Sequence, residues 1–169
     1  MQSSFVRSTV YSGHYLGLLF SVNFILRTIS NPELKPSTGM HFDLSPIFVG
    51  LIVFLSYFFL SNYKNRECEG VIDFKTSFLY VFISGFYASL LSSIVKLVYV
   101  IFINKELLSV MRNIQLEVFQ KMKFPDMGYV TSITDALYQP VPFSIMFLMS
   151  DMIYVAFLAL FVALIIKKR

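Results

Sequence analysis

Residues 140–166 read PVPFSIMFLMSDMIYVAFLALFVALII, and Asp151 is the only charged residue among them. A helix needs about 20 predominantly apolar residues to cross the ~30 Å hydrocarbon core of a bilayer, because each residue rises ~1.5 Å. The stretch is apolar on all sides, which a surface helix of a soluble protein is not. It therefore predicts a membrane-spanning helix over residues 142–166, which the basic residues 167–169 bring to an end.

Three further windows of similar length carry few charges: residues 44–63 have none, and residues 8–32 and 76–104 have one each. We expect four transmembrane helices, over residues 9–30, 45–63, 77–103 and 142–166. The first is the most polar, since a histidine, an asparagine and an arginine lie inside it. A cleaved signal peptide is the alternative there, but no small-residue cleavage site follows the apolar run.

The composition agrees with a lipid environment. Of the 169 residues, 56% are hydrophobic and only 14% are charged, against roughly 25% charged in ordinary soluble domains. The mean hydropathy is +0.68, and a single core of this size cannot hide so many apolar side chains. We therefore expect an all-α integral membrane four-helix bundle that forms one domain over residues 1–169, and not a water-soluble globule.

Lys and Arg residues beside the spans predict the orientation, because basic flanks resist translocation. Seven of them lie on the side that holds both termini, against five spread over the longer loops of the opposite side. Both termini are therefore expected in the cytoplasm. The single cysteine, Cys68, then falls in a cytoplasmic loop and has no partner for an intrachain disulfide.

The long segment 104–141 contains a further helical pattern. Apolar residues recur in it at helical spacing, namely Leu107, Leu108, Met111, Ile114, Val118 and Met122. This spacing predicts an amphipathic helix over about residues 105–123, with Asn104 in a position to cap it. Such a helix either lies flat on the outer membrane face or connects the spans while packed on the bundle, and the residues leave both alternatives open.

Four polar side chains inside the spans form the candidate site. Lys96 and Asp151 both fall roughly 10 to 14 Å below the outer boundary, so antiparallel neighbours would join them as a buried ion pair. Asn23 and Arg27 lie in the same outer half. An uncompensated charge in hydrocarbon costs at least ~2.5 kcal/mol, so these charges should pair or face a wet cavity. The cluster is either a proton or ion site or a network that locks the bundle, with Lys96 and Arg27 extending outward.

Small residues one turn apart indicate faces on which helices pack closely. Three such faces are present: Gly13 and Gly17; Gly85, Ser89 and Ser93; and Ala159 and Ala163. They join helices within one bundle or, alternatively, form a dimer.

Residues that would indicate a metal site or an enzyme are sparse. His14 has no ligand type at helical spacing, and His41 with Asp43 would supply only two ligands. Phosphate loops, nucleophile elbows and paired cysteine ligands are absent from the sequence. We therefore expect no catalytic residues, no metal and no cofactor. The isoelectric point of about 9.2 arises largely from the basic flanks, so no nucleic-acid partner is expected.

The run CEGVIDFKTSF at residues 68–78 leads into a long span with Gly85 and a tyrosine-bearing end at Tyr99. Together with the order of the spans, the long loop before the last one and the basic C-terminus, it resembles a family of small bacterial four-helix membrane proteins known only as a domain of unknown function. The resemblance covers essentially the whole chain, although residues 104–106, NKE, stand where a proline is expected. It implies an inner-membrane protein of the bacterial envelope with no assigned activity, and it supplies no catalytic residues.

These observations favour a non-enzymatic accessory or structural membrane subunit, in contact with membrane lipids and with a second copy or another membrane protein. The alternative is a small oligomeric transporter or channel in which Asp151 is the coupling group and Lys96 its partner. A third hypothesis, a lipid-modifying enzyme, predicts convergent acids or histidines in a hydrophilic pocket at one interface.

Overall fold

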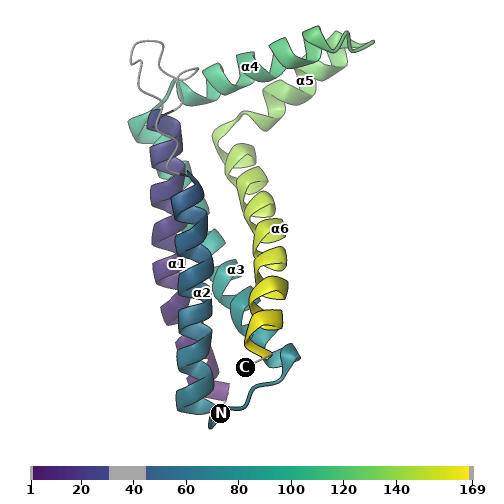
Figure 1. Ribbon diagram of the computed structural model, residues 1–169. Coiled ribbons are helices and arrows are strands. Elements are labelled where there is room, and N and C mark those ends of the chain that lie inside the picture. Colours follow the sequence, from purple (N-terminus) through teal and green to yellow (C-terminus); the bar gives the residue numbers. More distant parts are fainter. Residues whose placement is uncertain (1, 31–44, 168–169) are drawn as a thin grey trace.

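The computed structural model describes residues 2–30 and 45–167. No strand occurs within these ranges, so the expectation of an all-α fold is confirmed. Four long helices lie side by side, and two short helices form an arm at one end of them (Figure 1). The long helices are α1 (Gln2–Ser30), α2 (Ser45–Glu67), α3 (Phe74–Val98) and α6 (Pro140–Lys167). The start of α1 and the end of α6 lie at the end opposite the arm (Figure 1).

Within the described ranges, three helices are long and apolar enough to cross a membrane, namely Pro46–Glu67, Phe74–Ile103 and Pro140–Ile166. They correspond to the predicted spans at 45–63, 77–103 and 142–166. The remaining prediction, a span over residues 9–30, is confirmed as a helix but is not among these three. The histidine, asparagine and arginine that make this span the most polar of the four lower the mean hydropathy of α1.

α3 is the central member of the group, because it makes the most extensive contacts, with α1 and with α6. Its buried face consists mainly of small side chains: Ser77, Ser84, Gly85, Ala88, Ser89, Ser92 and Ser93. Membrane helices associate by close packing and not by the hydrophobic effect, so small residues allow the backbones to approach. The close approach of the neighbouring helices therefore depends on small side chains over much of this face, which also includes Tyr80, Val81 and Lys96.

The contact between α1 and α3 uses the predicted glycines. A Cβ added to Gly13 would lie 2.9 Å from the carbonyl oxygen of Ser84, and one added to Gly17 would lie 3.2 Å from that of Ala88. The hydroxyl groups of Ser12 and Ser84 also form a 2.8 Å hydrogen bond across this contact. Gly13 and Gly17 thus join helices within one chain, as the first of the two alternatives predicted.

The contact between α3 and α6 is closer still. A Cβ on Gly85 would lie 2.7 Å from Cγ2 of Val155, and real Cβ atoms do not approach other atoms so closely. Ala159 and Ala163 of α6 are fully buried. These faces also join helices within the chain.

The end of α3 differs from the prediction. The helix continues as a π-helical turn over Tyr99–Ile103, in which the amide of Asn104 donates to the carbonyl of Tyr99 at 2.9 Å. We had expected Asn104 to cap the next helix. Instead, Asn104 ends the π-helical turn. The cap of α4 (Leu107–Lys121) is Glu106, which makes no capping bond with its side chain.

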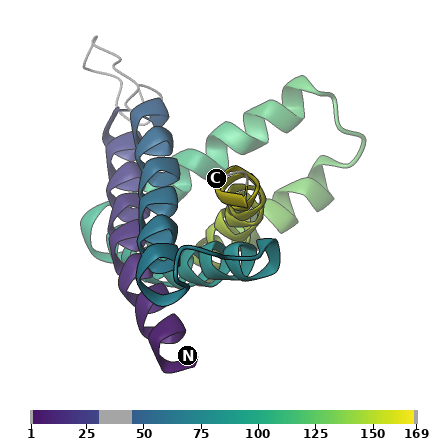
Figure 2. The same cartoon turned by 60° about the horizontal axis from the view of Figure 1, so that its bottom comes forward.

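The arm consists of α4, which confirms the helix expected over 105–123, and α5 (Met127–Leu137), which the sequence analysis missed. α5 is short and rich in Thr, Ser, Gly and Tyr, which are weak helix formers. Its start did carry a signal, because Asp126 accepts a hydrogen bond from the amide of Tyr129 at 2.9 Å. Figure 2 shows α4 and α5 extending away from the long helices.

We predict that Gly85→Ala destabilises the fold by about 1–3 kcal/mol, the usual cost of overpacking a tight contact, because the new methyl group meets Val155. The measurement is the thermal unfolding midpoint in detergent, followed by circular dichroism. Gly50→Ala is the matched control, since nothing lies within 4 Å of a Cβ at Gly50. A second change, Val155→Ala, should restore part of the loss. Equal midpoints for Gly85→Ala and Gly50→Ala would contradict the packing argument.

Candidate functional site

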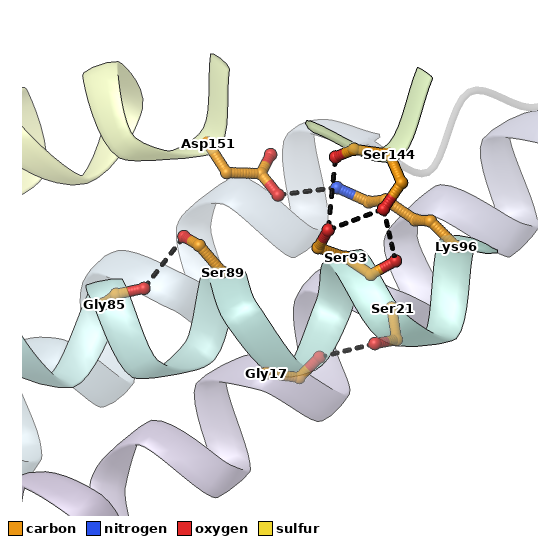
Figure 3. Close-up of polar contacts among 8 residues, drawn as sticks. All are labelled: Gly17, Ser21, Gly85, Ser89, Ser93, Lys96, Ser144 and Asp151. Atoms are coloured by element: carbon orange, nitrogen blue, oxygen red, sulfur yellow. Dashed lines mark hydrogen bonds and ion pairs between the residues drawn. The ribbon is translucent and has the colours of Figure 1, made fainter. Parts of the chain in front are cut away.

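Two charged residues meet inside the group of long helices. Lys96 Nζ donates to Asp151 Oδ2 at 2.6 Å, which joins α3 to α6 (Figure 3). The side chain of Lys96 is 3% exposed and that of Asp151 is 22% exposed. The predicted ion pair is therefore present. The expectation that its two residues lie at equal depth is wrong, because the long side chain of Lys96 runs back past Ser93 to reach Asp151 (Figure 3). The alternative that Lys96 extends outward to the interface is wrong, since the carboxylate holds its ammonium group inside.

Aromatic rings flank the ammonium group of Lys96. Nζ lies 4.9 Å from the ring centroid of Phe147 and 5.6 Å from that of Phe24. The negative faces of aromatic rings attract cations at these distances, and more strongly where water is excluded. Two helices besides α3 thus stabilise the charged form of Lys96: α6, through Asp151 and Phe147, and α1, through Phe24.

A pair of serines fixes the register of α3 against α6 next to the ion pair. The hydroxyl groups of Ser93 and Ser144 lie 2.8 Å apart. Each hydroxyl also donates to the carbonyl of the other residue at 3.1 Å (Figure 3). Ser93 precedes Lys96 by three residues, and Ser144 precedes Asp151 by seven. Because α3 and α6 are antiparallel, the backbones of the two charged residues lie on opposite sides of the serine contact, and the long Lys96 side chain spans the difference (Figure 3).

A cavity of about 310 Å³ lies beside the ion pair. All four residues of the predicted cluster line it: Asn23, Arg27, Lys96 and Asp151. Asn23 and Arg27 reach it together because they are four residues apart on one face of α1. The remaining wall is mostly apolar and comes from α1, α2 and α6. The structure therefore brings together the side chains that the sequence analysis could only place at similar depth.

Tyr154 and Ser150 also line this cavity, and the sequence analysis did not include them. Their position on α6 could have indicated them, since Ser150 is one residue and Tyr154 three residues from Asp151. The hydroxyl oxygen of Tyr154 is buried without a hydrogen-bond partner among the described residues, and so is Oδ1 of Asn23. Arg27 is exposed and makes no ion pair with any described residue.

The other residues weighed as metal ligands do not converge. His14 lies on α1, where Nδ1 is 2.8 Å from the carbonyl of Val10 and the ring lies against Tyr87. His41 and Asp43 lie outside the described residues. Within the described ranges no three His, Cys, Asp or Glu side chains gather in a way that could hold a metal ion.

An exposed ion pair joins the two helices of the arm. Arg112 Nε on α4 donates to Asp135 Oδ1 on α5. This hydrogen bond raises the pKa of the Arg112 guanidinium. The pair is far more exposed than the one between Lys96 and Asp151, so its contribution to stability is small.

Residues 11–168 match the model of a family described as "Protein of unknown function (DUF4199)". The chain belongs to this family. The match covers α1 from Tyr11 onward and every later helix, so the cavity of this DUF4199 member lies wholly within the family region. No curated protein and no solved structure matches the chain.

We predict that Lys96→Met or Asp151→Leu alone destabilises this DUF4199 chain by about 3–5 kcal/mol, because each leaves a buried charge without its partner. The double variant should lose less than either single variant, since no charge remains. Thermal unfolding in detergent measures all three. Arg112→Gln is the control for losing an exposed pair, and it should change the midpoint little. Additive losses in the double variant would show that the two charges do not interact.

Proposed function

We propose that the protein is an integral membrane four-helix bundle in which α1 spans the bilayer together with α2, α3 and α6. α1 has 29 residues, which at ~1.5 Å each exceed the ~30 Å hydrocarbon core. Hydrogen bonds inside the fold satisfy several of its polar side chains. Ser21 and Thr28 donate to carbonyls of the preceding turn, at 2.7 and 2.8 Å, and both are buried. The average hydropathy of α1 therefore understates how well it fits a membrane.

In this proposal the membrane is the cytoplasmic membrane of a bacterium, and both termini face the cytoplasm. The basic flanks support the orientation, as does the position of the first and last helical residues at one end of the bundle (Figure 1). The arm of α4 and α5 then lies at the outer face. Its exposed apolar side chains, Met122, Phe124, Tyr129, Ile133 and Leu137, fit contact with the lipid surface.

The orientation predicts which side of the membrane each connection occupies. In a Cys68→Ser background, Asn65→Cys should react with a membrane-impermeant maleimide only after the inner membrane is opened, whereas Ser132→Cys on α5 should react in intact spheroplasts. Both positions are exposed, so a difference in their reactivity reports the side of the membrane on which each residue lies. The reverse pattern would place the termini outside.

We further propose that this bundle is a non-enzymatic accessory or structural subunit of a larger membrane assembly. The observation that carries the proposal is that α2 packs sparsely against the other long helices. The window of α2 that could span the membrane is the least buried of the three, and Ile52, Ser56 and Leu60 are its buried positions between residues 46 and 60. Its outer face is an apolar row of Ile47, Leu51, Phe54 and Phe58, beside which Gly50 leaves open space. Membrane helices pack at such open glycines.

The accessory role predicts that a second membrane protein, or a second copy, covers this face of α2. A photoreactive phenylalanine analogue at Phe54 should form one discrete protein adduct in membranes. The same analogue at Phe157, an equally outward aromatic residue on α6, should give only lipid adducts. Mass spectrometry identifies the adducts. Absence of a protein adduct at Phe54, or equal adducts at both positions, would contradict the role.

The cavity beside the ion pair favours a second candidate, a small oligomeric transporter or channel. In that case Asp151 is the coupling group and Lys96 its partner, and both reach the cavity. Asp151→Asn would then abolish proton or solute flux in proteoliposomes. Under the accessory role the substitution changes stability and leaves flux as in empty vesicles.

A further inference from the structure

The cavity beside Lys96 and Asp151 contains more polar groups than the ion pair uses. An ammonium group carries three protons, and Lys96 donates one hydrogen bond within the described residues, to Asp151. Asn23 Oδ1 and Tyr154 Oη are buried and have no partner in that part of the chain. Buried polar atoms are nearly always hydrogen-bonded in folded proteins. Among the described residues, these atoms therefore have hydrogen-bonding capacity that no protein group uses.

The charges around the cavity do not cancel. Lys96 and Arg27 are cationic, and Asp151 is the one carboxylate among the lining residues. The net charge of the lining is therefore positive. An unbalanced charge is costly at membrane depth, and a group of opposite charge lowers that cost. Arginine also presents several N–H groups in a fixed plane, which matches the oxygens of a carboxylate or phosphate group.

The size of the cavity is that of a small-molecule site. Its volume of about 310 Å³ lies at the lower end of the range of roughly 300–1,000 Å³ that is typical of ligand pockets. Like such pockets, it has a mainly apolar wall and a few converging polar groups. Water would satisfy Asn23 and Tyr154 but would leave the positive charge unbalanced. An anion with a hydrogen-bond donor satisfies both requirements.

We propose that this cavity binds a small oxyanion, a carboxylate or phosphate group that also carries a hydroxyl donor. The charged oxygens accept hydrogen bonds from Arg27 and from Lys96 Nζ, and the hydroxyl donates to Asn23 Oδ1. Two sources share this chemistry: a soluble hydroxy acid or phosphate ester, and the headgroup of an anionic phospholipid. The inference goes beyond the accessory role and does not depend on transport.

The test measures the thermal unfolding midpoint of the full chain in nanodiscs. One arm titrates glycerate and glycerol 3-phosphate into phosphatidylcholine nanodiscs, with potassium chloride at equal ionic strength as the reference. The other arm replaces part of the lipid with phosphatidylglycerol. Because a ligand that binds only the folded state raises its stability with concentration, we expect a midpoint that rises and saturates in one arm.

Two variants and a control separate this site from general salt effects. Arg27→Gln and Asn23→Leu should each weaken the apparent affinity by about tenfold or more, which corresponds to ~1.4 kcal/mol. Both variants should fold, since Arg27 is exposed and Asn23→Leu removes a buried atom without a partner. Arg112→Gln changes an exposed arginine on the arm and should bind as the unchanged protein does.

The outcomes are distinct. A response to a soluble anion assigns the site to a free solute, and a response confined to phosphatidylglycerol assigns it to a lipid headgroup. The proposal fails if no midpoint rises in either arm, or if Arg27→Gln and Asn23→Leu respond as the unchanged protein does. None of these results bears on the crosslinks at Phe54, so the accessory role is tested separately.

Discussion

The ion pair between Lys96 and Asp151 is the constraint on which the arrangement of the long helices depends. A charge without a partner is costly at membrane depth, so α3 and α6 must meet where the side chain of Lys96 can reach the carboxylate of Asp151. Ser93 and Ser144 secure that register close to the pair. α1 completes the surroundings of the ammonium group through Phe24. The buried Lys96 of α3 thus contacts both α1 and α6.

Close packing makes this arrangement possible. Gly85 lets α6 approach α3, and Gly13 and Gly17 let α1 approach α3 from another direction. At such short distances several serine hydroxyls reach across the contacts or bond to their own helix. Asn23 Oδ1 on α1 and Ser92 Oγ on α3 remain buried without a partner among the described residues. α2 lacks this kind of contact over most of its length, and its outer row of aromatic and aliphatic residues faces away from the other helices.

The sequence predicted the fold well where one physical rule dominated. Charge-poor windows identified the long helices, and the cost of an unpaired charge inside them identified Lys96 and Asp151 as partners. The prediction failed where local signals were weak or where neighbours decided the outcome. α5 is made of weak helix formers and is started by Asp126, while Asn104 ends a π-helical turn that no periodicity indicates.

The amino-acid sequence by itself determined that the chain is helical, that most of its long helices suit a membrane, and which few charges lie inside them. These properties follow from the length and hydropathy of each segment, which can be read from that segment alone. Only the tertiary structure decided that Asn23, Arg27, Lys96 and Asp151 share one cavity with Tyr154. That grouping depends on how each helix is rotated about its axis. Rotation is set by contacts such as the one between Gly85 and Val155, which involve residues far apart in the chain.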